Sequence, residues 1–212
     1  MIRILVADDH EVVRKGLIGL LAQRPDWQVC AEAGNGRDAV AFANRFRPNV
    51  AILDLSMPEL NGLEATRQIR HEVPETEVLV FSMYENEQFV RDLLSAGARG
   101  YVLKSDVATQ LLNAVETVAR HKPFFTSDIA EKVLEGYLKL AEGTDAPGIL
   151  TAREREIVQL LAESKSNKEV STVLGISVKT VQTHRAAIMR KLGINSVVEL
   201  VHYAIRNNLV SP

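Results

Sequence analysis

Acidic side chains stand at points where short β-rich runs of the sequence end. Asp8 and Asp9 follow the first run, and Asp54 closes the third. Ser82 follows the fourth run and Lys104 the fifth. Carboxylates that are packed together repel one another, and a hard divalent cation with oxygen ligands relieves that repulsion. These residue types therefore predict a Mg²⁺ site with room for a phosphate.

The same residues suggest phosphoryl transfer. A carboxylate beside a bound cation can attack a phosphoryl donor and become an aspartyl-phosphate, and Asp54 is predicted to do so. Lys104 and the Ser82 hydroxyl would then hold the phosphoryl oxygens. Taken singly, Asp8 and Asp9 are better explained as caps of a helix. Their combination with three further strand ends favours the phosphoryl-transfer site.

The runs that must position these residues alternate with segments of helical periodicity, which is typical of βα units on a parallel sheet. The five expected strands are Ile2–Ala7, Gln28–Ala33, Val50–Leu53, Val78–Phe81 and Tyr101–Leu103. A doubly wound sheet binds its ligand outside the carboxyl ends of its strands, where the polar residues stand. Residues 1–122 are therefore predicted to form a doubly wound α/β domain.

A glycine pattern over Gly34–Ala39 formally matches G-x-G-x-x-[GA], the dinucleotide-binding fingerprint. In a dinucleotide fold this loop follows the first strand, whereas here it follows the second. The acid that it would recruit, Asp54, is better explained as the phosphoacceptor. Dinucleotide binding is therefore rejected.

Residues 123–148 are predicted to be a linker with one short helix, because the acidic stretch ends in a segment rich in Gly, Asp and Pro. Residues 149–212 read as a small all-α domain of four helices. Thr151 and Glu154 form a plausible capping box. Gly175 supplies a turn into a third helix that Ser177 caps. This order is helix, tight turn, helix.

Charge is distributed unevenly around a formal net value of −2. Residues 149–212 hold nine Lys and Arg against five Asp and Glu, whereas residues 1–122 hold 14 against 17. Only the C-terminal part has the net positive charge expected of a protein that binds a polyanion. No apolar run approaches membrane-spanning length, and two acids interrupt the N-terminus too early for a secretory signal. A cytoplasmic protein is expected.

The segment Asp54–Gly62, with Asp8 and Asp9 upstream and Lys104 downstream, resembles the receiver domain of two-component response regulators. The resemblance covers residues 1–120 and implies a flavodoxin-like fold. It also implies that a sensor histidine kinase phosphorylates Asp54. Mg²⁺ would be held by Asp8, Asp9, Asp54 and the backbone carbonyl of Leu55.

Two further residues match the receiver family's switch pair. The resemblance implies that phosphorylation draws the Ser82 hydroxyl towards the phosphate while the Tyr101 ring moves inward. One position departs from the family pattern, because Ser105 follows Lys104 where many receivers have a proline and a cis bond.

The C-terminal segments Leu150–Glu156, Ser166–Val170 and Lys179–Arg185 resemble the LuxR-type helix-turn-helix over residues 148–210. Joined to a receiver, this domain is similar to the NarL/FixJ subfamily. The resemblance places Gln182, Thr183 and Ala186 at base edges. It places the following residues at DNA phosphates: Lys179, Thr180, Arg185, Arg190 and Lys191.

The leading hypothesis is a transcription regulator, not an enzyme, in which phosphorylation of Asp54 alters receiver conformation, dimerisation and promoter binding. The last helix has more apolar residues than so small a domain needs to bury, and part of this stripe is expected to form the seam of a homodimer: Val198, Leu200, Val201 and Ile205. In a second hypothesis the receiver is passive and DNA binding is independent of phosphate. A third is a Mg²⁺-dependent phosphohydrolase, although Ser56 stands where such enzymes carry an acid.

Overall fold

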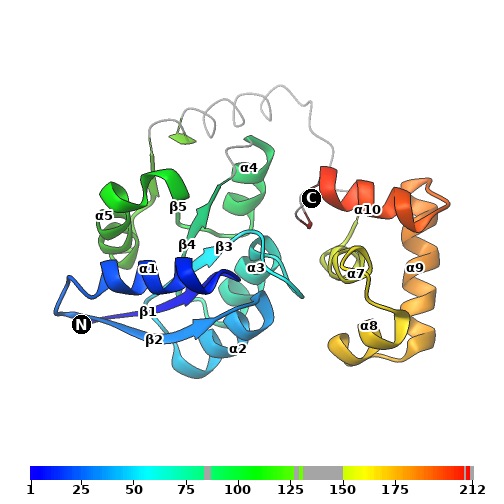
Figure 1. The fold of residues 1–212 in the computed structure, drawn as a ribbon, viewed down its shortest axis with the longest axis horizontal. Helices are drawn as coiled ribbons and strands as arrows, with labels where there is room; N and C mark the ends of the chain where they lie inside the picture. The colour runs from blue at the N-terminus through cyan, green and yellow to red at the C-terminus, as the bar shows by residue number, and fades with distance from the viewer. Residues whose placement is uncertain (84–86, 127–128, 131–149, 208, 211–212) are drawn as a thin grey trace.

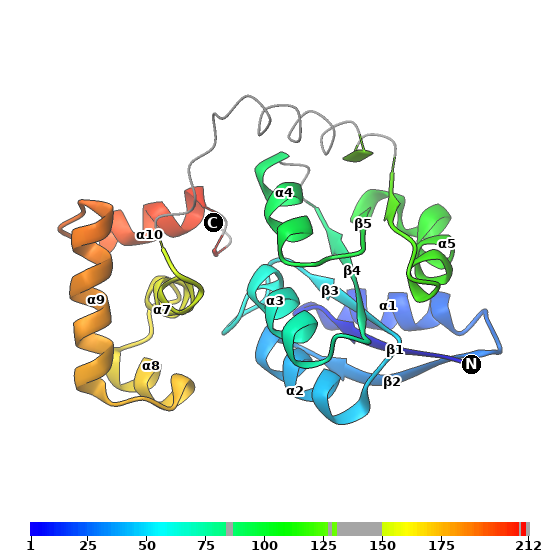
Figure 2. The ribbon, with the colours of Figure 1, turned by 180° about the vertical axis from the view of Figure 1, so that it is seen from behind.

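The computed structural model describes residues 1–212 apart from 84–86, 127–128, 131–149, 208 and 211–212. The described residues form an N-terminal α/β unit and a C-terminal helical unit. Both views show the two units side by side, with helix α7 (Ala152–Ala162) nearest the N-terminal unit (Figures 1 and 2). None of the described helices is both long and apolar enough to span a membrane.

A parallel sheet of six strands forms the centre of the N-terminal unit, in the order β2-β1-β3-β4-β5-β6. The strands are β1 (Ile2–Ala7), β2 (Trp27–Ala33), β3 (Val50–Asp54), β4 (Glu77–Ser82), β5 (Gly100–Leu103) and β6 (Phe124–Phe125). The chain order 2-1-3-4-5 confirms the predicted doubly wound sheet and contains all five predicted strands.

Strand β6 was not predicted. It lies within residues 123–148, which were predicted to be a linker. The Phe124 N–H donates to the Arg99 carbonyl at 3.1 Å, and the two strand residues pair with Gly100 and Tyr101. Two residues are too few to show the alternation that marks a strand in sequence. The short helix predicted for the linker lies largely outside the described residues.

Helices cover both faces of the sheet because successive strand residues point to opposite sides. Val50 and Ile52 of β3 face the core built with α1 (Glu11–Leu21) and α5 (Val107–Ala119). Ala51 and Leu53 face the core on the other side. That second core is covered by the remaining helices: α2 (Gly36–Phe46), α3 (Gly62–Glu72) and α4 (Glu87–Ser95). A short 3₁₀ turn, Lys104–Asp106, leads into α5.

The C-terminal unit consists of α7, α8 (Asn167–Leu174), α9 (Val178–Leu192) and α10 (Val197–Arg206). Both halves of the predicted capping box are formed, because Thr151 accepts from the Glu154 N–H and Glu154 accepts from the Thr151 N–H. Gly175 takes the predicted left-handed turn with φ +63°. Ser177 caps α9 by accepting from the Thr180 N–H. The predicted helix, turn, helix order is confirmed.

Two glycines let the loop after Asp54 pack tightly. A Cβ atom at Gly62 would lie 2.1 Å from the Asp54 carbonyl oxygen. A Cβ atom at Gly36, in the rejected dinucleotide pattern, would lie 1.9 Å from the Leu60 carbonyl oxygen. Both contacts are with backbone, which cannot move aside as a flexible side chain can. Glycine is therefore required at the start of α2 and of α3 for a steric reason.

Replacing Gly62→Ala should destabilise the fold by roughly 2–3 kcal/mol, because the added methyl group overpacks the end of β3. Gly19→Ala is the matched control, since a Cβ atom there meets nothing within 4 Å. It should stabilise α1 by about 0.5–1 kcal/mol. Urea unfolding of both variants measures the difference, and equal effects would contradict the steric explanation.

Candidate functional site

Three of the predicted site residues form a close cluster at the carboxyl edge of the sheet. Lys104 Nζ lies 2.7 Å from Asp8 Oδ2 and 3.1 Å from Asp54 Oδ2. Asp8 is fully buried and Asp54 is 4% exposed. The three residues come from the ends of β1, β3 and β5, as the parallel sheet requires.

Burial and neighbouring charges shift the pKa values of this cluster. Burial raises the pKa of the Asp54 carboxyl, and the Asp8 charge adds to the rise, while Lys104 opposes it. Burial lowers the pKa of Lys104, but hydrogen bonds and attraction from Asp8 and Asp54 outweigh burial and raise it overall. The ammonium group is therefore held in its charged form between two carboxylates.

Asp9 extends the acidic cluster towards solvent, and His10 lies beside it. His10 Nδ1 is 2.7 Å from Asp9 Oδ1 and 3.4 Å from Asp8 Oδ1. The Asp8 side chain accepts from the His10 N–H, and no side-chain hydrogen bond caps α1. The capping interpretation is therefore wrong for this pair of acids. His10 was not among the predicted site residues.

The donor set suits Mg²⁺. Lys104 contacts the carboxylates of Asp8 and Asp54, and the Asp9 carboxylate lies beside His10. Carboxylate oxygen is the ligand that Mg²⁺ prefers. A ligand atom from each of Asp8, Asp9 and His10 lies within 4.8 Å of the others. A divalent cation at this place would offset the surplus negative charge.

The loop after β3 positions Asp54, the predicted phosphoacceptor. The Leu55 N–H donates to Asp54 Oδ1 at 2.8 Å. The Leu55 carbonyl, predicted as a metal ligand, accepts from the Gly62 N–H at 2.9 Å. One lone pair of that carbonyl oxygen is thus already in use. Coordination of Mg²⁺ by Leu55 stays a prediction.

Both members of the predicted switch pair are buried. Ser82 is fully buried at the end of β4, and Tyr101 of β5 is 1% exposed within the core that α2, α3 and α4 cover. The Tyr101 ring therefore lies inward. No cis peptide bond occurs among the described residues, so the bond between Lys104 and Ser105 is trans.

Helix α9 presents most of the predicted DNA-contacting side chains to solvent. The exposed ones are Lys179, Thr180, Gln182, Thr183, Ala186, Arg190 and Lys191, while Arg185 is half-buried. Gln182, Arg185 and Ala186 line one surface hollow together with Asn167 and Met189. The start of α8 and the middle of α9 thus share a concave surface.

Lys191 differs from the other predicted phosphate contacts. Its Nζ lies 2.7 and 2.8 Å from the two carboxylate oxygens of Glu154. This ion pair lowers the pKa of Glu154 and joins the end of α9 to the start of α7. The role of Lys191 at DNA stays a prediction, and the structure gives it a second role within the domain.

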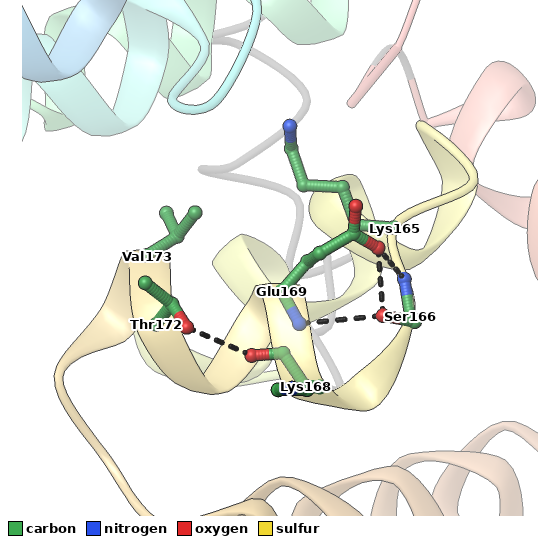
Figure 3. A pocket seen from close by; sticks show the side chains of 6 residues that line it. All are labelled: Lys165, Ser166, Lys168, Glu169, Thr172 and Val173. Atoms are coloured by element: carbon green, nitrogen blue, oxygen red, sulfur yellow. Dashed lines mark hydrogen bonds between the residues drawn. The ribbon is translucent and has the colours of Figure 1, made fainter.

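Helix α8 begins with a second capping box, which the sequence analysis did not identify. Ser166 accepts from the Glu169 N–H, and the Glu169 carboxylate accepts from the Ser166 N–H and hydroxyl (Figure 3). Lys165 and Lys168 line the same surface hollow as this capping box. The ammonium groups of two lysines therefore lie near the start of α8.

The predicted dimer seam on α10 is only partly available. Leu200 is 1% exposed and belongs to the core of the C-terminal unit, so it cannot contact a partner. Val197 and Val198 are 43% and 63% exposed. The start of α10 therefore offers the apolar surface for the part of the stripe that was predicted to form a seam.

Comparison with known families separates the same two units. Residues 4–116 match the response regulator receiver domain. Residues 148–204 match the bacterial regulatory proteins of the luxR family. The two matched ranges correspond to the α/β unit and the helical unit.

Curated relatives align over nearly the whole chain. The transcriptional regulatory protein LiaR of Bacillus subtilis (strain 168) is 37% identical over 211 residues, covering 100% of both chains. The oxygen regulatory protein NreC of Staphylococcus aureus (strain JH9) is 39% identical over 214 residues, covering 98% of this chain and 99% of the relative.

Solved structures show the same architecture. A LuxR-family two-component response regulator from Aurantimonas sp. SI85-9A1 has a TM-score of 0.62 at 33% identity, covering 65% of this chain and 99% of that one. The RcsB response regulator bound to DNA has a TM-score of 0.60 at 25% identity, covering 95% and 96%. With both domains matched in order, the chain belongs to the LuxR-type, NarL/FixJ subfamily of DNA-binding two-component response regulators.

Proposed function

We propose that this regulator is phosphorylated on Asp54 by a sensor histidine kinase, and that phosphorylation changes its dimerisation and its affinity for promoter DNA. The contact between Lys104 and the carboxylates of Asp8 and Asp54 carries this proposal. This contact brings a carboxylate nucleophile, the ammonium group of Lys104 and acidic metal ligands to one edge of the sheet. Phosphoryl transfer requires these groups.

The chemical step follows from the arrangement. An oxygen of Asp54 attacks the phosphorus of a phosphohistidine, a P–O bond forms, and the P–N bond breaks as the histidine leaves. Lys104 can turn from Asp54 towards the incoming phosphoryl oxygens while it keeps its contact with Asp8. Mg²⁺ held by Asp8, Asp9 and Asp54 would supply further positive charge for the phosphoryl group.

DNA binding is supported by the exposed face of α9 and by a relative. Gln182, Thr183 and Ala186 are exposed on one helix that a tight turn at Gly175 presents. The RcsB relative is described in complex with DNA, and another of its structures contains RcsB dimers on DNA. A homodimer that reads paired half-sites agrees with the exposed valines of α10.

A receiver that is passive in DNA binding is the second candidate. The predicted phosphohydrolase is a weaker candidate, because Ser56 still offers no carboxyl group for protonating a leaving group.

Asp54→Asn should raise the free energy of unfolding at neutral pH in the absence of divalent cations. Because the pKa of Asp54 is raised on folding, the ionised carboxyl costs free energy at neutral pH, and this cost disappears in acid below the carboxyl pKa. Thermal unfolding in EDTA measures the change. Asp26→Asn, at an exposed position, should stay within about 0.5 kcal/mol of wild type.

Beryllofluoride with Mg²⁺ mimics the phosphoryl group and should strengthen binding to DNA selected from a random pool by about 5- to 150-fold. Asp54→Asn should abolish this response. Fluorescence anisotropy measures affinity, and sedimentation measures the oligomeric state. Identical affinity and oligomeric state with and without beryllofluoride would support the passive receiver instead.

Two substitutions on α9 should separate base reading from phosphate contact. Gln182→Ala should weaken the free energy of binding to the preferred DNA sequence by about 1–3 kcal/mol and should relax the base preference at one base pair. Lys179→Ala should weaken binding to all DNA sequences alike. It should also lower the slope of log affinity against log salt concentration by about one. Affinities on matched and mismatched duplexes at several salt concentrations test both expectations. A uniform loss for Gln182→Ala would argue against its role in base reading.

A further inference from the structure

The strand order separates Lys104 from the carboxylates that it contacts. Lys104 follows β5, whereas Asp54 ends β3 and Asp8 follows β1. Strand β4 lies between β3 and β5 (Figure 2). Lys104 Nζ nevertheless lies 2.7 Å from Asp8 Oδ2 and 3.1 Å from Asp54 Oδ2. The lysine side chain must therefore cross β4 to reach both carboxylates.

One side chain of β4 lies along this crossing. In the register of the sheet, Phe81 is paired with Asp54 of β3 on one side and with Val102 of β5 on the other. Paired residues of neighbouring strands point to the same face, and Lys104 stands two residues beyond Val102. Lys104 Nζ lies 5.4 Å from the centre of the Phe81 ring. Lys104 therefore reaches the acidic edge by passing over this ring.

The Phe81 ring is held in place by the core. It is 2% exposed and packs in the core that α1 and α5 cover. The Lys104 side chain is only 13% exposed, so its ammonium group is largely removed from water. A cation within about 6 Å of the centre of an aromatic ring is attracted to the ring face, and more strongly when water is excluded. The distance and the burial at Lys104 meet both conditions.

The ring and the carboxylates attract Lys104 in different ways. Asp8 and Asp54 offset the charge of the ammonium group, whereas a neutral ring attracts the cation through its quadrupole and leaves the charge intact. Because the ring belongs to the core, it can hold Lys104 both before and after the Asp54 carboxylate is converted to an acyl phosphate. Phe81 is thus suited to keep a full positive charge at the place where a phosphoryl group arrives.

We propose that Phe81 is a positioning residue for the reaction at Asp54, and that the face of its ring holds the Lys104 ammonium group at the carboxyl edge of the sheet. This inference rests on the proposed function. Without the ring, Lys104 would spend part of its time away from the two carboxylates. The site would then lose positive charge that the phosphoryl group needs, and Mg²⁺ would lose a competitor for the same carboxylates.

Fluorination of the ring separates this attraction from packing. Fluorine withdraws electron density from the ring face while the size of the ring changes little. We therefore expect mono-, di- and pentafluorophenylalanine in place of Phe81 in the full chain to bind beryllofluoride progressively more weakly at saturating Mg²⁺. The loss should reach about two- to tenfold with pentafluorophenylalanine. Calorimetric titration measures the affinity.

Binding of Mg²⁺ without beryllofluoride gives a second readout of opposite sign. Because Lys104 and Mg²⁺ compete for the carboxylates of Asp8 and Asp54, the same series should bind Mg²⁺ more tightly, by about twofold. A purely structural role of Phe81 would weaken both affinities together, or would leave both without a trend along the series. Either result would overturn the inference.

Phe81→Leu removes the ring altogether and keeps an apolar side chain in the core. It should change both affinities in the same directions as pentafluorophenylalanine does, and thermal unfolding reports whether the variant is folded. The matched control is the same fluorinated series at Phe42 of α2, a half-buried ring that packs on the core of the opposite sheet face. Both affinities should be unchanged in the control series.

The two proposals fail in different ways. If wild type binds no beryllofluoride in the presence of Mg²⁺, the proposed function fails, and the inference fails with it. If wild type binds it and the fluorinated variants bind it equally well, only the role of Phe81 is refuted.

Discussion

The contact of Lys104 with two buried carboxylates is the interaction on which the site depends. Asp8 and Asp54 would repel each other at the edge of the sheet, and the Lys104 ammonium group lies within 2.7 Å of one and 3.1 Å of the other. The raised pKa of Asp54 shows that this compensation is incomplete. The site is therefore assembled with a surplus of negative charge, which a divalent cation would offset.

The sequence was sufficient to predict the features that depend on local pattern. The five principal strands, the Thr151 capping box and the Gly175 turn are confirmed, because each is encoded by residues adjacent in the chain. The convergence of Asp8, Asp54 and Lys104 could also be predicted, since parallel strands bring their carboxyl ends to one edge.

Features that depend on tertiary contact could not be predicted in this way. Strand β6 has two residues and forms because β5 offers a free edge. Only part of the apolar stripe of α10 was expected to form a dimer seam, and the sequence did not indicate that Leu200 is buried in the core of the helical unit. Gln159 and Glu163 are polar residues on an amphipathic helix, and such residues usually face solvent. Here they accept from the N–H groups of Asn61 and Glu59, about a hundred positions earlier in the chain.

The central claim is that Asp54 accepts a phosphoryl group, and chemical trapping tests it most directly. Incubation with acetyl phosphate and Mg²⁺, followed by borohydride reduction, converts an aspartyl-phosphate to homoserine, which peptide mass spectrometry locates. The account predicts homoserine at position 54 and nowhere else. Modification at another acid, or none at position 54 in a folded chain with Mg²⁺ present, would contradict it.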